Sequence, residues 1–299
     1  MTNDSFGRGG YVDRTFCIVA QGGGMIASYQ AGVIRALKER FGLSRLGRVV
    51  ASSGAAMNFS YVVSGQEHLI EPIWDGLIQS GRFISSLRHI HRRGVMDIDF
   101  LVDEMIRKRF PLDVAALMHS PVKFDVGVTH AITGSSWYFS KNVCECFFYE
   151  LLRASCAVPY FYGKQVYLNG EYWYDGTIGS VVGLEQAINE QNILFILTRP
   201  PRPIRKLAVP RMVLRWLLLR SEHQALQRAI LNMPREFNRA LEDINELKKE
   251  RNIVVIQPRK RLPIWRIDTS MERLRATIEQ GYQDTLHNKK ELEFFFAQV

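Results

Sequence analysis

Cysteine is scarce in this sequence, and nothing in its pattern indicates a disulfide scaffold. There are four cysteines in 299 residues, far fewer than small stapled domains carry. Cys144 and Cys146 form a C-x-C pair without a second half-site, so the spacing does not predict a zinc centre. We expect free thiols in a reducing compartment, and neither a metal nor a cofactor is implied.

Long apolar runs are missing as well. No stretch approaches the ~20 apolar residues of a membrane-crossing helix. Residues 1–13 are polar and lack the apolar core of a signal peptide. The strongest apolar cluster, residues 212–219, contains Arg215 and is flanked by Arg211 and Arg220. We therefore expect a cytoplasmic protein, with membrane contact limited to a peripheral surface.

The composition is that of a globular protein with an excess of positive charge. Hydrophobic residues make up 46% and charged residues 23%, and the net charge is +9. Such an excess favours an anionic partner, either nucleic acid or an anionic lipid surface. No nucleic-acid-binding motif is present, so no nucleic acid is expected. In residues 211–220, arginines alternate with Trp216 and leucines. This pattern favours a helix that packs its apolar face on the domain and leaves the arginines in solvent, with docking at a lipid interface as the alternative.

The first part of the chain repeats one structural unit. Residues 15–20 are apolar and β-rich, glycines follow, and residues 29–41 show helical spacing of apolar side chains. A second strand ends at Val50, a tight turn follows, and residues 56–63 form the next helical stretch. Two consecutive strand–turn–helix units predict an α/β fold with a parallel sheet covered by helices.

Later segments extend the predicted sheet. Asn169-Gly170 between two β-rich runs predicts a hairpin, because a type I′ turn requires positive φ at both residues. Residues 192–198 and 253–256 are apolar runs typical of buried parallel strands. A proline-rich stretch from residue 200 introduces a helical insertion at about residues 201–251. We expect a single domain over residues 1–299, with a polar tail at 1–13.

Gly22-Gly23-Gly24 follows the first strand and leaves backbone N–H groups uncovered. Near a helix N-terminus, such groups bind a phosphate or the oxyanion of an acyl-transfer intermediate. The dinucleotide fingerprint fails because its last glycine falls at Ala27, and no phosphate-binding P-loop sequence occurs.

Ser53 lies in the turn between the second strand and its helix. A nucleophile elbow requires small residues two positions before and after the serine, and Ala51 and Ala55 meet that need. Ser52 does not meet it, because Val50 occupies the earlier position. Taken alone, Ser53 is more simply explained as a helix N-cap.

Asp175-Gly176 follows the predicted hairpin, and one Asp-Gly pair is by default a turn. A serine nucleophile nevertheless needs a base. None of the seven histidines occurs in a Ser…Asp…His context. An aspartate with a raised pKa can accept the serine proton directly.

In this order, the glycine loop, the elbow and the Asp-Gly pair resemble the patatin-like phospholipases. Residues 29–33 (YQAGV), Thr133-Gly134 and residues 153–159 (RASCAVP) add to the resemblance. It implies a three-layer α/β/α sandwich with a mostly parallel central sheet and a helical C-terminal insertion. It also implies a phospholipase A, lysophospholipase or esterase that forms an acyl-enzyme on a phospholipid or other lipid ester. The implied site residues are Ser53 as nucleophile, Asp175 as general base, Gly22, Gly23, Gly24 and Met25 as the oxyanion hole, and Ala51, Ala55 and Gly176 in the elbow and Asp-Gly motifs.

The chain departs from the family pattern at several positions. The glycine loop, usually G-G-G-x-[RK]-G, has Ile26 and Ala27 at its last two positions, so the cation near the oxyanion hole is missing. Both elbow glycines are alanine, which predicts some strain there. Thr177 replaces the second glycine of Asp-Gly-Gly, and Gly183 replaces a downstream proline. These changes fit a weakened or specialised hydrolase, and the alternative is a catalytically silent fold that binds lipid or another partner.

Overall fold

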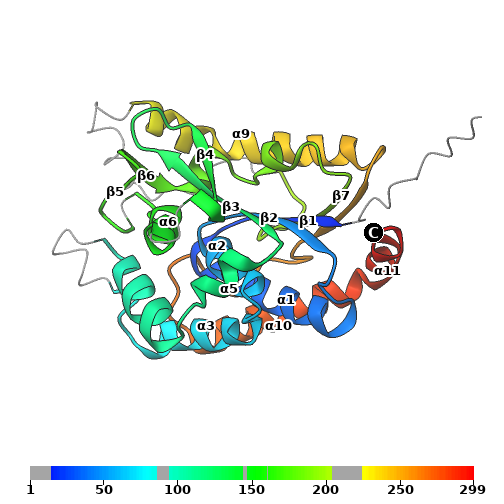
Figure 1. Ribbon diagram of the computed structural model, residues 1–299, viewed down its shortest axis with the longest axis horizontal. Coiled ribbons are helices and arrows are strands. Elements are labelled where there is room, and N and C mark those ends of the chain that lie inside the picture. The colour runs from blue at the N-terminus through cyan, green and yellow to red at the C-terminus, as the bar shows by residue number, and fades with distance from the viewer. Residues whose placement is uncertain (1–14, 86–93, 144–146, 160, 204–223) are drawn as a thin grey trace, which may run out of the picture.

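An eight-stranded sheet forms the centre of the computed structural model, which describes residues 15–85, 94–143, 147–159, 161–203 and 224–299. The strand order is β5-β6-β3-β2-β1-β7-β8, and β4 pairs with β3 beside this path (Figure 1). The strands are β1 (Phe16–Ala20), β2 (Leu46–Ser52), β3 (Lys123–His130), β4 (Ser136–Ser140), β5 (Val166–Leu168), β6 (Glu171–Asp175), β7 (Asn192–Ile196) and β8 (Asn252–Ile256).

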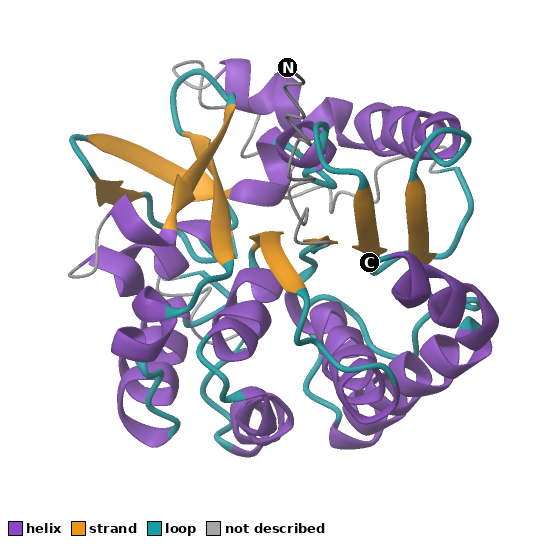
Figure 2. Ribbon diagram, turned by 45° about the vertical axis from the view of Figure 1, so that its right-hand side comes forward, coloured by secondary structure: helices purple, strands orange, loops and turns teal. Residues whose placement is uncertain are grey.

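Helices lie on both faces of this sheet (Figure 2). The α-helices are α1 (Tyr29–Arg40), α2 (Gly54–Val63), α3 (Ile70–Gln79), α5 (Val114–His119), α6 (Phe148–Ser155), α7 (Gly176–Gly179), α9 (Gln224–Leu247), α10 (Met271–His287) and α11 (Lys289–Gln298). Shorter or differently wound helices are η1 (Gly24–Ser28), η2 (Glu67–Leu69), η3 (Phe100–Arg109), η4 (Lys141–Val143) and η6 (Leu184–Ala187).

The sheet is mostly parallel, as the sequence predicts. Strands β3, β2, β1, β7 and β8 run parallel, whereas β4, β5 and β6 join as antiparallel strands. The predicted hairpin is confirmed: β5 pairs with β6, and Asn169 and Gly170 have φ of 52° and 84°. Because the carboxyl ends of parallel strands share one edge, the turns after β1 and β2 meet there.

Alternate residues of β1 contribute to the two cores. Phe16 and Ile18 lie in the core shared with α1, α2, α3 and α10. Cys17 and Val19 lie in the opposite core, with Phe237 of α9. A buried strand covered on both faces has apolar residues at every position, which explains its unbroken apolar sequence. The predicted three-layer α/β/α sandwich is therefore confirmed (Figure 1).

Two glycines let α1 and α10 cross with their backbones in contact. A Cβ added at Gly32 would lie 1.8 Å from the Ile278 carbonyl oxygen, and one at Gly281 would lie 2.0 Å from that of Tyr29. The Tyr29 hydroxyl also donates to Asp284 at 3.3 Å. Since α1 follows the glycine loop, this crossing fixes the C-terminal part of the chain close to that loop.

The segment between β7 and β8 contains α9, within the predicted insertion at about 201–251. The Arg/Trp/Leu stretch 211–220 and the Cys144/Cys146 pair lie outside the described residues. Within the described ranges, no helix is both long and apolar enough to cross a bilayer. The division of the chain into one domain stays a prediction.

Candidate active site

Ser53 occupies a sharp turn between β2 and α2. Its φ and ψ are 58° and −138°, a conformation that side-chain-bearing residues rarely adopt and that is costly unless the surroundings hold it. The Ser53 N–H donates to Ser155 Oγ at 2.8 Å, and that hydroxyl donates to the Gly127 carbonyl at 2.7 Å. Ser155, the serine of the RASCAVP motif, thus stabilises the turn by linking it to β3.

The strain expected at the elbow alanines lies instead on Ser53. Ala51 belongs to β2 and Ala55 to the first turn of α2, and both are buried. Among the described non-glycine residues, positive φ occurs only at Ser53 and Asn169. The expectation of strain at Ala51 and Ala55 was therefore wrong, because their backbones are those of an ordinary strand and helix.

The Ser52 side chain faces the strands rather than the turn. A Cβ added at Gly127 would lie 2.3 Å from the Ser52 hydroxyl oxygen, and one at Gly176 would lie 2.8 Å from it. The added Cβ at Gly176 would also lie 2.2 Å from the Gly127 carbonyl oxygen. Glycine is required at Gly127 and Gly176, because β3, the Ser52 hydroxyl and the start of α7 leave no space for a Cβ atom there.

Asp175 lies at the end of β6, wholly buried and opposite Val128 of β3. Its Oδ1 accepts two hydrogen bonds from Thr177, one from the N–H at 2.9 Å and one from the hydroxyl at 2.5 Å. Its Oδ2 is buried and has no hydrogen-bond partner of ordinary geometry among the described residues. Thr177 therefore belongs to the candidate site as a hydrogen-bond donor to Asp175. In the sequence it was noted only because it replaces the second glycine of Asp-Gly-Gly.

Burial raises the pKa of Asp175 above the ordinary aspartate value, because the charged form is poorly solvated there. Hydrogen bonding from Thr177 and then from Ser53 opposes this rise, and the charge of Arg266 opposes it further. No Ser53–Asp175 hydrogen bond of ordinary geometry forms, and long contacts of this kind do not rule out proton transfer once a substrate binds. The structure thus brings Ser53 and Asp175 together, with one carboxylate oxygen left unsatisfied.

The glycine loop passes directly beside the elbow. A Cβ added at Gly22 would lie 2.6 Å from Ser53 Cβ, and Gly24 has φ of 60°. The N–H groups of Gly22, Gly23 and Gly24 donate to no other residue in the described part of the chain. Met25 differs, because its N–H donates to the Arg266 carbonyl at 3.1 Å. The prediction of Met25 as an oxyanion donor is therefore corrected: a contact from the C-terminal region occupies that group.

A series of buried side-chain hydrogen bonds fixes the start of the glycine loop. Gln30 donates to the Gln21 carbonyl at 2.7 Å, Asn58 donates to Gln30 at 3.0 Å, and Trp74 donates to Asn58 at 2.9 Å. The loop is thereby tied to α1, α2 and α3. Sequence reasoning did not single out these side chains, although Gln30 lies within the YQAGV motif.

A narrow apolar cavity begins at Ser53. Its volume is about 20 Å³, and its walls include Met57, Trp74, Met96 and Leu101. That volume holds little more than one small group, so an acyl chain would have to move these side chains. The two methionines are flexible enough to repack around a ligand.

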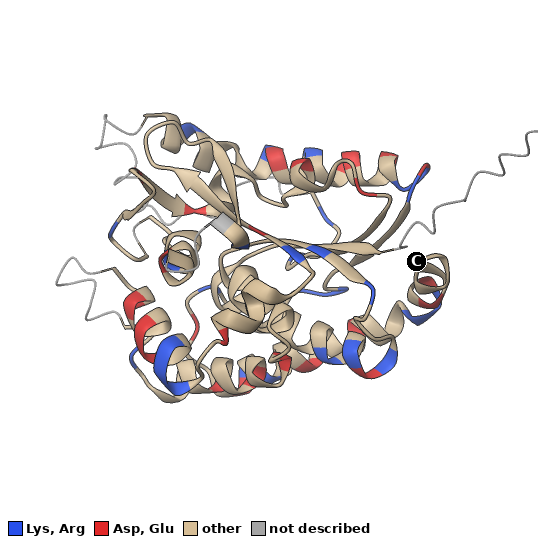
Figure 3. Ribbon diagram, viewed as in Figure 1, with Lys and Arg blue, Asp and Glu red and all other residues tan. Residues whose placement is uncertain are grey.

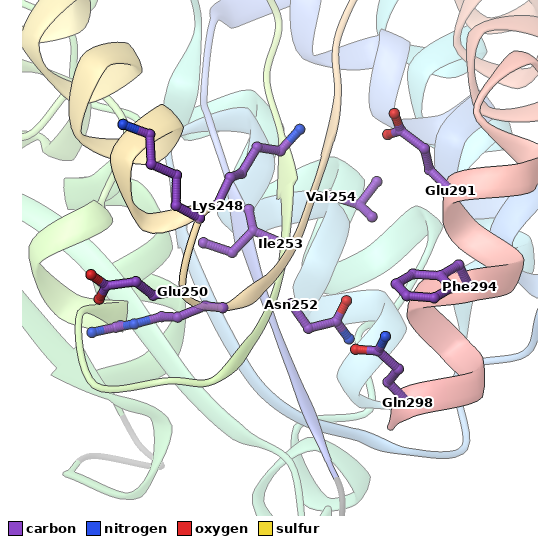
Figure 4. A pocket seen from close by; sticks show the side chains of 10 residues that line it. Lys248, Glu250, Asn252, Ile253, Val254, Glu291, Phe294 and Gln298 are labelled. Atoms are coloured by element: carbon purple, nitrogen blue, oxygen red, sulfur yellow. The ribbon is translucent and has the colours of Figure 1, made fainter.

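A larger hollow of about 500 Å³ lies elsewhere, between the end of α9, β8 and α11 (Figure 4). Lys248, Asn252, Glu291 and Phe294 are among the residues that line it. It opens at the start of β8, whereas Ser53 follows the end of a strand parallel to it in the sheet. This hollow is thus at the opposite edge from the candidate site.

No histidine contacts this site among the residues described. His119 bonds to the Ala115 carbonyl, and His130 bonds to Glu171 and Thr133. The same ranges hold no group of three or more His, Cys, Asp or Glu side chains placed to bind a metal.

Comparison with known proteins identifies the family. The sequence model of the patatin-like phospholipases matches residues 18–188, and that of the domain of unknown function DUF6363 matches residues 223–297. The uncharacterized protein YjjU of Escherichia coli is 23% identical over 201 residues, which are 61% of this chain and 52% of YjjU. The chain thus spans about half the length of this curated relative.

The fold is also similar to a solved structure. The crystal structure of VipD from Legionella pneumophila superposes with a TM-score of 0.52 at 13% identity, covering 94% of this chain and 67% of that one. This likeness concerns the fold alone. Since the patatin-like match covers more than half of the sequence, the chain belongs to the patatin-like phospholipase family, a family of lipid hydrolases.

Proposed function

We propose that the protein is a serine acyl hydrolase that cleaves lipid acyl esters with the pair Ser53 and Asp175. The observation that carries the proposal is their juxtaposition. Ser53 is held at positive φ in a strand-to-helix turn, and a buried carboxylate with an unsatisfied Oδ2 and a raised pKa lies beside it. An unsatisfied buried acceptor is costly, and receipt of the serine proton would satisfy it.

The reaction proceeds in two steps. Ser53 Oγ attacks the ester carbonyl carbon while its proton passes to Asp175, and the carbonyl oxygen takes up the electron pair. The N–H groups of Gly22, Gly23 and Gly24 stabilise that oxyanion. The C–O bond to the alcohol then breaks, the alcohol leaves with the proton from Asp175, and an acyl-enzyme remains. Water attacks the acyl-enzyme in the same manner and releases the carboxylic acid.

We further propose a phospholipid or other lipid ester as substrate, in a cytoplasmic protein that contacts anionic membranes peripherally. The apolar lining of the cavity at Ser53 favours a substrate with an acyl chain on one side of the ester. The net charge of +9 supports attraction to anionic lipid. Sedimentation with vesicles tests the contact: binding should require anionic lipid and weaken with salt, and equal binding to neutral vesicles would contradict it.

The second candidate is a silent, lipid-binding member of the fold. The small volume of the cavity at Ser53 is the observation that favours it. Turnover of a short-chain p-nitrophenyl ester separates the two candidates. We expect turnover by the wild type, its loss in Ser53→Ala, and its retention in Ser52→Ala, whose hydroxyl packs against glycine backbone. Absence of turnover in the wild type would favour the silent fold.

A further inference from the structure

Two guanidinium groups beside the candidate site form no ion pair within the described residues. Two other arginines of low exposure have acidic partners: Arg48 lies 2.6 Å from Asp125, and Arg153 lies 2.6 Å from Asp99. On the outer helices, basic and acidic residues also alternate (Figure 3). Arg199 and Arg266 are half-buried and yet form neither an ion pair nor a side-chain hydrogen bond with any described residue.

Arg266 is held on the glycine loop by its own backbone. Its carbonyl accepts the Met25 N–H at 3.1 Å, and a Cβ added at Gly24 would lie 2.7 Å from the same oxygen. Asp268, two residues later, is fixed by an ion pair with Arg273 at 2.7 Å. The segment between β8 and α10 therefore packs against the glycine loop.

Arg199 also lies next to this loop. The preceding residue, Thr198, donates to the Gly22 carbonyl at 3.0 Å. The Arg199 guanidinium lies over the Phe237 ring, 5.8 Å from its centroid. The ring supports the cation without neutralising it.

The two cations influence each other and the catalytic carboxylate. Burial and the charge of Arg266 together lower the pKa of Arg199 to about 10. Burial also lowers the pKa of Arg266, and the charge of Asp175 opposes that change. Because a guanidinium keeps its proton in proteins, the edge of the site carries positive charge that a bound anion would neutralise.

We propose that Arg199 and Arg266 bind a phosphate group on the alcohol side of the substrate ester. The acyl side is taken by the apolar cavity, whose walls come from α2, α3 and η3. Arg199 follows β7 and Arg266 lies in the segment before α10, and both segments contact the glycine loop. Arg266 would thus supply, from the C-terminal region, the cation that the loop itself lacks at Ile26. This inference rests on the proposed function and gives the region after α9 a part in it.

A binding experiment tests the anion site without catalysis. Ser53→Ala, which cannot be acylated, is titrated in a calorimeter with glycerol 3-phosphate, inorganic phosphate and glycerol. We expect glycerol 3-phosphate to bind, glycerol not to bind, and affinity to fall about tenfold or more when Arg199→Gln or Arg266→Gln is added.

Arg261→Gln is the matched control, because Arg261 is an exposed arginine of the same segment, and it should change affinity less than twofold. Unchanged affinity in both glutamine variants would overturn the site, and equal affinity for inorganic phosphate would overturn its assignment to the substrate.

A kinetic arm links the site to the reaction. The enzyme is given a monoacylglycerol and its 3-phosphate with the same acyl chain, and the ratio of kcat/KM values is measured. We expect the ratio to favour the phosphate ester and to fall about tenfold or more in Arg199→Gln and in Arg266→Gln, with partial recovery in Arg266→Lys. A ratio unchanged in both glutamine variants would contradict the proposal. If the wild type hydrolyses neither ester while the titration shows the arginine-dependent binding, the hydrolase proposal fails and the anion site stands.

Discussion

Asp175 illustrates at the scale of one residue how reactivity and stability oppose each other. Its carboxylate is buried with one unsatisfied oxygen, which suits a proton acceptor and disfavours the folded state. The folded-state pKa is raised, so the folded protein holds the proton to higher pH than the unfolded chain does. Stability is therefore lost as pH rises from the ordinary aspartate pKa through the raised folded value, and at neutral pH the charge is a net cost.

Asp175→Asn should separate the two effects. Asparagine keeps Oδ1 as the acceptor for Thr177 and removes both the charge and the base. We expect turnover to fall by about 10² or more, while the thermal midpoint at pH 7 rises. Each kcal/mol of added stability corresponds to about 2–4 °C in a chain of this kind. Retained turnover, or a lowered midpoint, would contradict this account of Asp175.

The pH profile should report the same carboxylate. Since the base must be deprotonated, kcat/KM should fall on the acid side around a pKa above the ordinary aspartate value. Arg266→Gln should move this acid limb to higher pH, because the charge of Arg266 lowers the pKa of Asp175. Arg261→Gln is the control with the same change in net charge. An acid limb that stays in place in Arg266→Gln would show that the guanidinium does not act on Asp175.

At the scale of elements, the elbow tolerates alanine at positions 51 and 55 because the strained backbone is that of Ser53. Ala55 is in the first turn of α2, so glycine there should cost about 0.5–1 kcal/mol through conformational entropy. We expect Ala55→Gly to lower stability by that amount and to leave esterase turnover unchanged or lower. Urea unfolding and turnover of a short-chain ester measure both. A rise in turnover in Ala55→Gly would contradict this expectation and indicate that the backbone at Ala55 is strained.

The glycine loop should tolerate no side chain at Gly22. A Cβ there would lie 2.6 Å from both the Ser52 carbonyl oxygen and Ser53 Cβ, so Gly22→Ala should displace the elbow and abolish turnover. Gly42→Ala is the matched control, because Gly42 has φ of 80° with nothing within 4 Å of an added Cβ. The control should lose about 1 kcal/mol of stability and keep its turnover. Normal turnover in Gly22→Ala would mean that the loop and the elbow are not in close contact.

Sequence patterns predicted those elements whose cause is local. The parallel strands, the hairpin at Asn169-Gly170 and the helices after the first two turns follow from residue periodicity and turn chemistry. The Asp-Gly pair and the elbow serine also stand out locally, because tight turns restrict residue choice. The positive φ at Ser53 did not, since the pattern of small neighbours does not say which residue bears the strain.

The parts that sequence reasoning missed depend on contacts between distant segments. Nothing in the chain near Met25 indicates that its N–H is engaged by Arg266, or that Thr198 contacts Gly22. Such contacts arise only once β7 and the C-terminal region are placed against the glycine loop. At this place the sequence showed only that Ile26 stands where the family usually has a cation.

At the scale of the whole molecule, the region after α9 packs against the candidate site. β8 extends the sheet beside β7, and α10 crosses α1 with backbone contact at Gly32 and Gly281. The segment between them places Arg266 on the glycine loop. The match to a separate domain of unknown function over residues 223–297 thus covers a segment that packs directly on the patatin-like core.

The proposed mechanism requires that Ser53 be a nucleophile activated without histidine. Labelling with a fluorophosphonate probe, followed by peptide mass mapping, tests it most directly, with heat-denatured protein as a control for nonspecific reaction. We expect one adduct on the peptide carrying Ser53, its absence in Ser53→Ala, and its persistence in Ser52→Ala. An unlabelled wild type, or an adduct that survives Ser53→Ala, would contradict it.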